Sequence, residues 1–329
     1  MKLWMLPEGV EESLPALAWR VEEIRRSLLD HYRAQGYSLI LPPFIEHLDA
    51  LLTGAAAGMD AVTFKLTDPA SGRLLGIRSD MTPQAARMAA RHFAAEPVVR
   101  LCYLGTVLRT KADAPGAPRA PRQVGCELFG ETSLAGDLEV LKLMLDTLRI
   151  AGVGGVHLDL GHVGVYRAVT GRLHLNEEGQ AALLDLLQRK SRPELAGFAA
   201  SNSLQPSDQA ALATLMQLNG DLSVLATARS KLAAYGEPVQ AALNSLEAVV
   251  AAVTLSHPGM PLHLDLAELR GAGYHTGLTF AAFVEGHGRE VARGGRYDGV
   301  GQEFGLSRPA TGFSADVNEL LRLSSAVSS

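Results

Sequence analysis

The sequence has very little cysteine, which excludes a disulfide framework. Only Cys102 and Cys126 occur among 329 residues, and both lie in apolar stretches typical of strands, so we expect two buried thiols. The ten histidines show no spacing with cysteine of the kind that binds zinc. The composition therefore predicts no metal site and gives no sign of a bound cofactor.

Long hydrophobic runs and an excess of positive charge are also missing. No stretch of about 18 apolar residues occurs, and the acidic start MKLWMLPEGVEES has no basic segment of a signal peptide. A net charge of -5 argues against broad binding of polyanions, although a local basic patch is compatible with that average. We therefore expect a soluble cytoplasmic protein without a membrane segment.

Helix and strand patterns alternate along the first half of the chain. Residues 11–35 have the apolar spacing of an amphipathic helix that ends at Gly36. Thr82 is a candidate N-cap, with Pro83 in the first helical position, and this arrangement puts Asp80 near a helix N-terminus. The remaining patterns predict a helix at 135–151 and strands at 37–41, 60–66, 73–78, 98–108, 124–129 and 156–160.

A long helical stretch then interrupts the mixed pattern. Residues 163–252 are almost wholly helical in pattern, with turn signals near 176, 191–193, 202–207 and 219–221. Strands resume at 262–266, 277–284 and 290–292, and a helix follows at 316–324. We therefore predict an α+β fold with a largely antiparallel sheet flanked by helices. Its core is expected in two parts, 1–162 and 254–329, around a helical insertion at 163–253.

The stretch from Arg100 to Gly130 contains the most informative pattern. Its two strands are joined by a loop with three prolines, which cannot lie inside a sheet ladder, so we expect a hairpin with a long loop. Alternation with a period of two puts Gln123 and Glu127 on one face, and Arg109 closes the first strand.

This hairpin face suits a zwitterionic ligand. Glu127 can pair with an ammonium group, Arg109 can hold a carboxylate through two hydrogen bonds, and Gln123 can donate or accept. The alternative, on the hairpin alone, is a solvated face carrying ordinary charges.

Several motifs resemble the class II aminoacyl-tRNA synthetases, and among them the histidyl-tRNA synthetases, over about Leu6–Leu323. Arg109, Gln123 and Glu127 match the arginine, glutamine and glutamate of motif two at the family's spacing. The other matching positions are Pro42 of the dimer-forming motif, Arg78-Ser-Asp-Met-Thr82, the histidine-specific Leu269-Arg270-Gly271 with Tyr274-His275-Thr276-Gly277, and Gly294-Gly-Arg-Tyr-Asp-Gly299. An alternative for the last motif is a tight strand-to-turn passage with Arg296 and Asp298 paired.

The departures from the synthetase pattern affect the nucleotide site. Glu319 stands where motif three has an arginine that holds the ATP phosphates, and Pro121 stands where motif two has the aromatic residue that stacks on adenine. The loop DAPGAP lacks the basic and aromatic character of the tRNA-contacting version. The sequence ends at Ser329, which we take to leave no room for an anticodon-binding domain. We therefore expect neither adenylation nor tRNA charging.

A retained amino-acid pocket beside a lost nucleotide site resembles the family of ATP phosphoribosyltransferase regulatory subunits. Arg78-Ser-Asp-Met-Thr-Pro-Gln84 is similar to a signature of that family. The resemblance implies a non-catalytic protein of histidine biosynthesis that self-associates as a dimer and activates a short-form catalytic subunit in a hetero-oligomer, expected to be a hetero-octamer. It also implies histidine as the feedback inhibitor and no tRNA partner.

The same resemblance implies how histidine binds. Glu127 and Asp80 are expected to hold its ammonium group, Arg109 or Gln123 with Arg270 its carboxylate, and three aromatic residues its imidazole. The full set of expected histidine-binding residues is Asp80, Thr82, Arg109, Gln123, Glu127, Arg270, Tyr274, His275 and Tyr297. Two alternatives stay open: a truncated histidyl-tRNA synthetase-like ligase that uses ATP, and a structural dimer that has lost its ligand.

Overall fold

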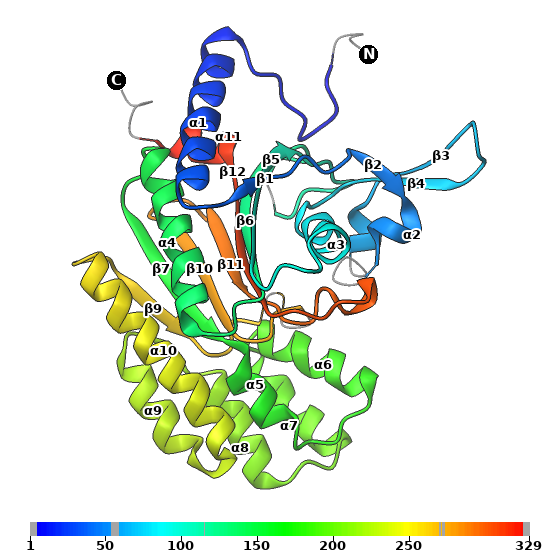
Figure 1. Ribbon diagram of the computed structural model, residues 1–329. Coiled ribbons are helices and arrows are strands. Elements are labelled where there is room, and N and C mark those ends of the chain that lie inside the picture. The colour runs from blue at the N-terminus through cyan, green and yellow to red at the C-terminus, as the bar shows by residue number, and fades with distance from the viewer. Residues whose placement is uncertain (1–4, 54–58, 115, 270, 272–273, 325–329) are drawn as a thin grey trace. The chain divides into compact units, whose positions relative to one another are not determined.

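The computed structural model describes residues 5–53, 59–114, 116–269, 271 and 274–324 (Figure 1). The chain forms two compact units. Unit 1 comprises Met1–Gly154 and Asp298–Ser329, and unit 2 comprises Gly155–Tyr297. The division at residues 162 and 253 that the sequence suggests stays a prediction.

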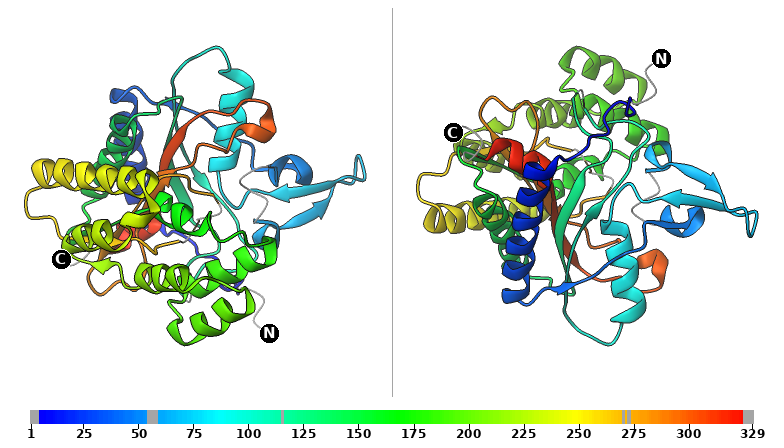
Figure 2. Two further views of the ribbon diagram at one scale, coloured as in Figure 1. Left: turned by 90° about the horizontal axis from the view of Figure 1, so that it is seen from below. Right: turned by 90° about the horizontal axis from the view of Figure 1, so that it is seen from above.

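The larger group of strands in unit 1 has the order β1 (Ser38–Leu39), β5 (Val99–Thr106), β6 (Arg122–Phe129) and β12 (Ala310–Asp316). The β1–β5 pair is parallel, whereas the β5–β6 and β6–β12 pairs are antiparallel. Figure 2 shows α1 (Pro15–Ala34) and α4 (Leu134–Ile150) on one side of these strands and α3 (Thr82–His92) on the other. The hairpin predicted around Arg100–Gly130 is therefore confirmed, and α3 covers its polar face.

A small second sheet of unit 1 has the order β2 (Ile45–His47), β4 (Leu74–Ile77) and β3 (Lys65–Thr67), with antiparallel pairs. The short helix α2 (Leu48–Leu51) follows β2, and α11 (Val317–Leu323) follows β12. The strand predicted at 60–66 is wrong over its first part. Residues 59–62 form a helical turn, and the ladder with β4 begins only at Lys65.

Unit 2 contains strands in the order β11 (Ala292–Arg296), β10 (Leu278–Val284), β7 (Val156–His162), β9 (Leu262–Asp265) and β8 (Asn219–Gly220). The β7–β9 pair is parallel and the other pairs are antiparallel. Its helical elements are α5 (Val163–Thr170), α6 (Glu177–Gln188), α7 (Arg192–Ser201), α8 (Pro206–Leu215), α9 (Ser223–Lys231), η2 (Ala233–Tyr235) and α10 (Glu237–Ser256). The predicted α+β organisation with largely antiparallel pairing is confirmed.

α10 is the single helix, within the part of the chain that the structure describes, that is long and apolar enough to cross a membrane by length and composition. One face of this helix is buried, including Val239, Leu243, Leu246 and Val253. It packs against α5 and α9. These contacts are those of the core helix of a helical bundle.

Two local predictions are wrong at element ends. Thr82 is the first residue of α3 and not its N-cap, which is Met81. The Asp80 side chain takes the capping role, because its Oδ1 accepts from the Thr82 N–H at 2.8 Å. The strand predicted at 290–292 runs instead from Ala292 to Arg296 as β11, since pairing with β10 accommodates its two glycines.

Candidate functional site

Glu127 and Gln123 lie on the face of β6 that alternation predicts, but this face is buried. Glu127 is 1% exposed and Gln123 is 5% exposed. In the β5–β6 ladder, Glu127 faces Leu101, and Gln123 faces Gly105. The alternative of a solvated hairpin face is therefore wrong, because an isolated carboxylate is seldom buried without a partner or a function.

A chain of hydrogen bonds surrounds the Glu127 carboxylate. The Tyr103 hydroxyl donates to its Oε1 at 2.8 Å, and the same hydroxyl lies 3.0 Å from the Thr82 Oγ1. Burial raises the pKa of Glu127 well above the usual range, although hydrogen bonds from Tyr103 and Thr82 oppose this shift. A positively charged group beside the carboxylate would favour its ionised form. The cluster therefore has the chemistry to accept an ammonium ion.

Gln123 is hydrogen-bonded within the chain at both ends of its amide. Its Nε2 donates to Asp80 Oδ1 at 2.9 Å, and its Oε1 accepts from the Met81 N–H at 2.9 Å. Both ends of the amide are therefore engaged by the segment that begins α3. Gln123 fixes the position of the Asp80 carboxylate, and its contact with a ligand carboxylate stays a prediction.

Arg109 has a carboxylate partner from its own chain. Its Nε donates to the Ser79 carbonyl at 3.1 Å, and its guanidinium pairs with Asp113 in the loop between β5 and β6. The Arg109 side chain is largely buried, whereas Asp113 is about half exposed. A ligand carboxylate that binds Arg109 would compete with Asp113 for this guanidinium.

Tyr103 is the functional residue that the sequence reasoning missed. The signal was available, because Tyr103 pairs with Gly125 and so lies on the same face as Gln123 and Glu127. Gly125 leaves room for the tyrosine ring: a Cβ at this position would lie 2.5 Å from the Phe313 carbonyl and 2.6 Å from the Tyr103 hydroxyl. Gly125 is therefore needed for the packing of Tyr103 in the polar cluster.

The predicted residues of unit 2 form an aromatic cluster. The rings of Tyr274 and Tyr297 stack at 4.8 Å with an interplanar angle of 18°, and the His275 ring meets Tyr274 edge-on at 5.3 Å. The His275 Nδ1 lies 3.3 Å from the Arg296 carbonyl, and burial lowers the pKa of His275 to about 4. This imidazole is therefore neutral at physiological pH. Arg270 lies outside the described residues.

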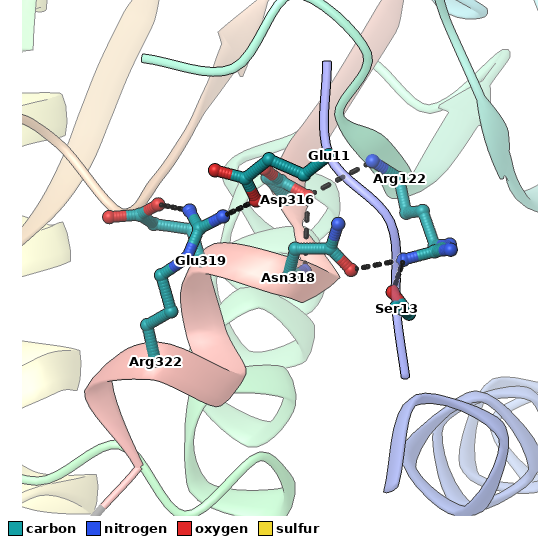
Figure 3. Close-up of polar contacts among 7 residues, drawn as sticks. All are labelled: Glu11, Ser13, Arg122, Asp316, Asn318, Glu319 and Arg322. Atoms are coloured by element: carbon teal, nitrogen blue, oxygen red, sulfur yellow. Dashed lines mark hydrogen bonds and ion pairs between the residues drawn. The ribbon is translucent and has the colours of Figure 1, made fainter. Parts of the chain in front are cut away.

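The position of the motif-three arginine is strongly acidic in this chain (Figure 3). Glu319 is 6% exposed and pairs with Arg322 at 2.7 Å, and Arg322 also pairs with Glu11 of the N-terminal segment. Asp316 adds a third carboxylate to the same group. The one cation among these side chains is thus already neutralised, so the group opposes the binding of a polyphosphate.

Asp316 connects β6, α11 and β12. Its Oδ1 accepts from the Asn318 N–H at 3.1 Å and from the Arg122 N–H at 3.0 Å. The Arg122 guanidinium then donates to Asn318 and to Ser13, as Figure 3 shows. These contacts fasten the N-terminal segment to the first turn of α11.

The described residues contain no group of three or more His, Cys, Asp or Glu side chains that could hold a metal ion. Cys102 and Cys126 are buried free thiols that face each other across the β5–β6 ladder. Burial raises the pKa of both thiols, so neither is an activated nucleophile.

Comparison with known protein families identifies the chain's relatives. The sequence profile of the histidyl-tRNA synthetase family matches residues 9–320. The chain is 51% identical to the ATP phosphoribosyltransferase regulatory subunit of Thioalkalivibrio sulfidiphilus over 98% of this chain and 81% of the relative. It is 50% identical to that of Methylococcus capsulatus over 98% of this chain and 79% of the relative.

Solved structures agree with this relationship. A regulatory subunit/histidyl-tRNA synthetase from Bacillus halodurans superposes with a TM-score of 0.86 at 26% identity, covering 99% of this chain and 84% of that one. A chain of the ATP phosphoribosyltransferase complex from Thermotoga maritima shares the fold, with a TM-score of 0.68 at 19% identity over 93% of this chain and 98% of that one. The predicted class II synthetase-like fold is confirmed. The chain therefore belongs to the histidyl-tRNA synthetase family and, within it, to the ATP phosphoribosyltransferase regulatory subunits.

Proposed function

We propose that this chain, a regulatory subunit without chemistry of its own, binds histidine and transmits the presence of this amino acid to a catalytic ATP phosphoribosyltransferase subunit. One observation carries the proposal. The buried Glu127 carboxylate keeps an ordered set of partners suited to an ammonium ion, whereas the position of the phosphate-binding arginine holds Glu319 in an acidic group. An amino-acid site has been retained where a nucleotide site has been lost.

In this proposal, the ligand's ammonium group pairs with Glu127, and Asp80 adds a second negative charge. The ligand's carboxylate binds Arg109 in exchange for Asp113. Gln123 acts indirectly by holding Asp80 and the start of α3. Recognition of the imidazole by Tyr274, His275 and Tyr297 stays a prediction that each side chain's own variant tests. The same holds for Arg270 on the carboxylate side and for Thr82 as a further binding residue.

Feedback inhibition requires that histidine bind one state of the assembly better than the other. A ligand with equal affinity for both states shifts nothing, however tightly it binds. A differential affinity of about 1–3 kcal/mol is typical of allosteric coupling. The binding energy that a synthetase uses to position a reactant is then used to change the population of an inhibited arrangement.

Titration calorimetry of the purified chain with histidine and, separately, with ATP tests this proposal. We expect heat from histidine and none from ATP. Binding of both ligands would favour the ATP-using ligase, and binding of neither would favour a structural dimer. Addition of the chain to the short-form catalytic subunit should raise phosphoribosyltransferase activity, and histidine should lower it again.

The proposed assembly is a cytoplasmic hetero-octamer with the short-form catalytic subunit, without tRNA. Self-association is proposed along the segment from the edge strand β1 to the start of β2, because Leu39 of β1, Leu41 and Phe44 of the connection, and Ile45 of β2 are exposed. Unpaired edge strands with apolar side chains favour association with another chain. Light-scattering mass measurement of the chain alone and of Leu41→Lys tests this surface, with a dimer expected for the first and a monomer for the second.

A further inference from the structure

The loop after β9 is tied to the end of helix α6. Lys190, just beyond α6, pairs through Nζ with Asp265 Oδ2 at 2.5 Å, and Gln188 Nε2 donates to the Leu269 carbonyl at 2.9 Å. Asp265 is 8% exposed, and its other oxygen accepts from the Ala267 N–H at 2.9 Å. Gln188 at the end of α6 and Lys190 just beyond it therefore hold residues 265–269, which precede the residues predicted to recognise histidine.

The backbone of Lys190 has a conformation that usually favours glycine. Its φ is 49°, in the left-handed region where a helix commonly ends on glycine. A residue with a Cβ is strained in this conformation, so glycine would be the better choice for the turn alone. Lysine at this position instead makes a short ion pair with the nearly buried carboxylate of Asp265.

Two further contacts come from the same helical region. The Leu266 N–H donates to the Leu218 carbonyl at 2.9 Å, and Arg167 of α5 donates to the His275 carbonyl at 2.7 Å. The segment is thus held at its beginning by α6 and the α8–β8 connection, and at His275 by α5. All of these contacts lie within unit 2.

We propose that Gln188 and Lys190 are positioning residues through which the helical region α5–α10 sets the affinity for histidine. The inference rests on the proposed function, because it concerns the segment that carries Tyr274 and His275. A segment ordered before the ligand arrives loses less conformational entropy on binding, so its contacts add to affinity without touching the ligand. A movement of α6 would therefore change the affinity for histidine.

The test compares Lys190→Gly and Gln188→Ala with Arg189→Ala in the full chain. Arg189 is an exposed neighbour that pairs locally, with Asp185 and Glu194, and is the matched control. Hydrogen exchange of the amides of Leu266–Glu268, the urea midpoint and the histidine dissociation constant are measured for each variant. We expect roughly tenfold faster exchange and roughly three- to tenfold weaker binding in the first two variants, and no change in the control.

The urea midpoint separates positioning from a structural role. Lys190→Gly relieves the strain of the left-handed turn but removes the ion pair with Asp265, and these effects oppose each other. Its urea midpoint should therefore stay close to that of wild type, whereas a residue needed for folding would lower the midpoint strongly. Unchanged exchange in Lys190→Gly would overturn the inference, and so would faster exchange with unchanged histidine affinity, while the proposed function would survive both results. A wild-type chain that binds no histidine would overturn both the proposed function and the inference.

Discussion

Glu127 is a buried acid whose charge depends on what faces it. Its partners in the described structure include neutral hydroxyl groups, and burial raises its pKa. An arriving ammonium would favour the ionised form, so a fraction of the bound ligand should expel a proton from this carboxyl. Below the pKa of Glu127 in the ligand-free chain, the affinity for histidine therefore rises with pH, by at most about tenfold per pH unit.

We expect Glu127→Ala to weaken histidine binding by roughly ten- to hundredfold, or about 1.5–3 kcal/mol, because the ammonium loses its charge-assisted contact. Glu127→Gln keeps an acceptor for Tyr103 and is the matched control for packing. Calorimetry at several pH values should show that the glutamine variant loses the part of the pH dependence that wild type adds to the ligand's own titration. An unchanged dissociation constant in Glu127→Ala would place histidine elsewhere.

Sequence reasoning found the face of this cluster but not all of its connections. Alternation alone assigns Gln123 and Glu127 to one side of a strand, because the period of a strand is fixed by its backbone. The direction of the Gln123 amide depends on Asp80 and Met81, which lie some forty positions earlier and meet it only in the folded chain. The contact between Arg109 and Asp113 was equally hidden, since a loop acid has many possible partners.

At the scale of elements, Asp316 makes the junction of β6, β12 and α11 sensitive to pH. Burial raises its pKa to about 6, and its Oδ2 is buried without a hydrogen bond to any described residue. The folded chain therefore binds this proton more tightly than the unfolded chain, whose aspartate has a pKa of about 3.9. The associated stability is fully present below about pH 4 and is lost as the pH rises through 6.

We expect Asp316→Asn to keep the cap of α11, because an amide oxygen can still accept from Asn318 and Arg122. The variant should gain up to about 3 kcal/mol of unfolding free energy relative to wild type between pH 4 and pH 7. Urea unfolding of both proteins across this range measures the difference. Parallel pH profiles would show that Asp316 stays ionised throughout.

Clear helical periodicity in the sequence predicted most helices, whereas the missed strands are short or have little apolar alternation. The turn signals near 176 and 219–221 fall between helices of unit 2, and those at 191–193 and 202–207 end on the first residues of α7 and α8. β12, with the sequence ATGFSAD, carries little apolar alternation and exists because it pairs along β6. β2 and β8 are three and two residues long, too short for a period to be detected. Tertiary pairing, rather than local preference, decides such strands.

At the scale of the whole molecule, loss of nucleotide chemistry should be complete. We expect no histidine-dependent exchange of pyrophosphate into ATP by the purified chain, because Glu319, Asp316 and Glu11 repel phosphates. Glu319→Arg should not restore exchange: the new cation would stand beside Arg322, and Pro121 still replaces the stacking aromatic. Radiolabelled exchange assays of both proteins check this, and robust exchange by wild type would contradict it.

Activation and inhibition should be separable by mutation. Gln123→Ala releases Asp80 inside a buried cluster, whereas activation of a partner requires an outer surface. We therefore expect this variant to activate the catalytic subunit normally and to need more histidine for inhibition, because weaker binding shrinks its effect on the equilibrium. Activity assays across a histidine series measure this. A variant that assembles but fails to activate would show that the cluster itself takes part in activation.

The pairing of Arg322 with two glutamates affects which ligands the molecule can respond to. Its catalytic partner consumes ATP, so the regulatory chain works in the presence of a ligand that its relatives bind. If the chain also bound ATP, its effect on the catalytic subunit would depend on the ATP concentration as well as on the histidine concentration. With Arg322 engaged by Glu11 and Glu319, we expect the chain not to respond to ATP, so that the proposed regulation depends on histidine alone.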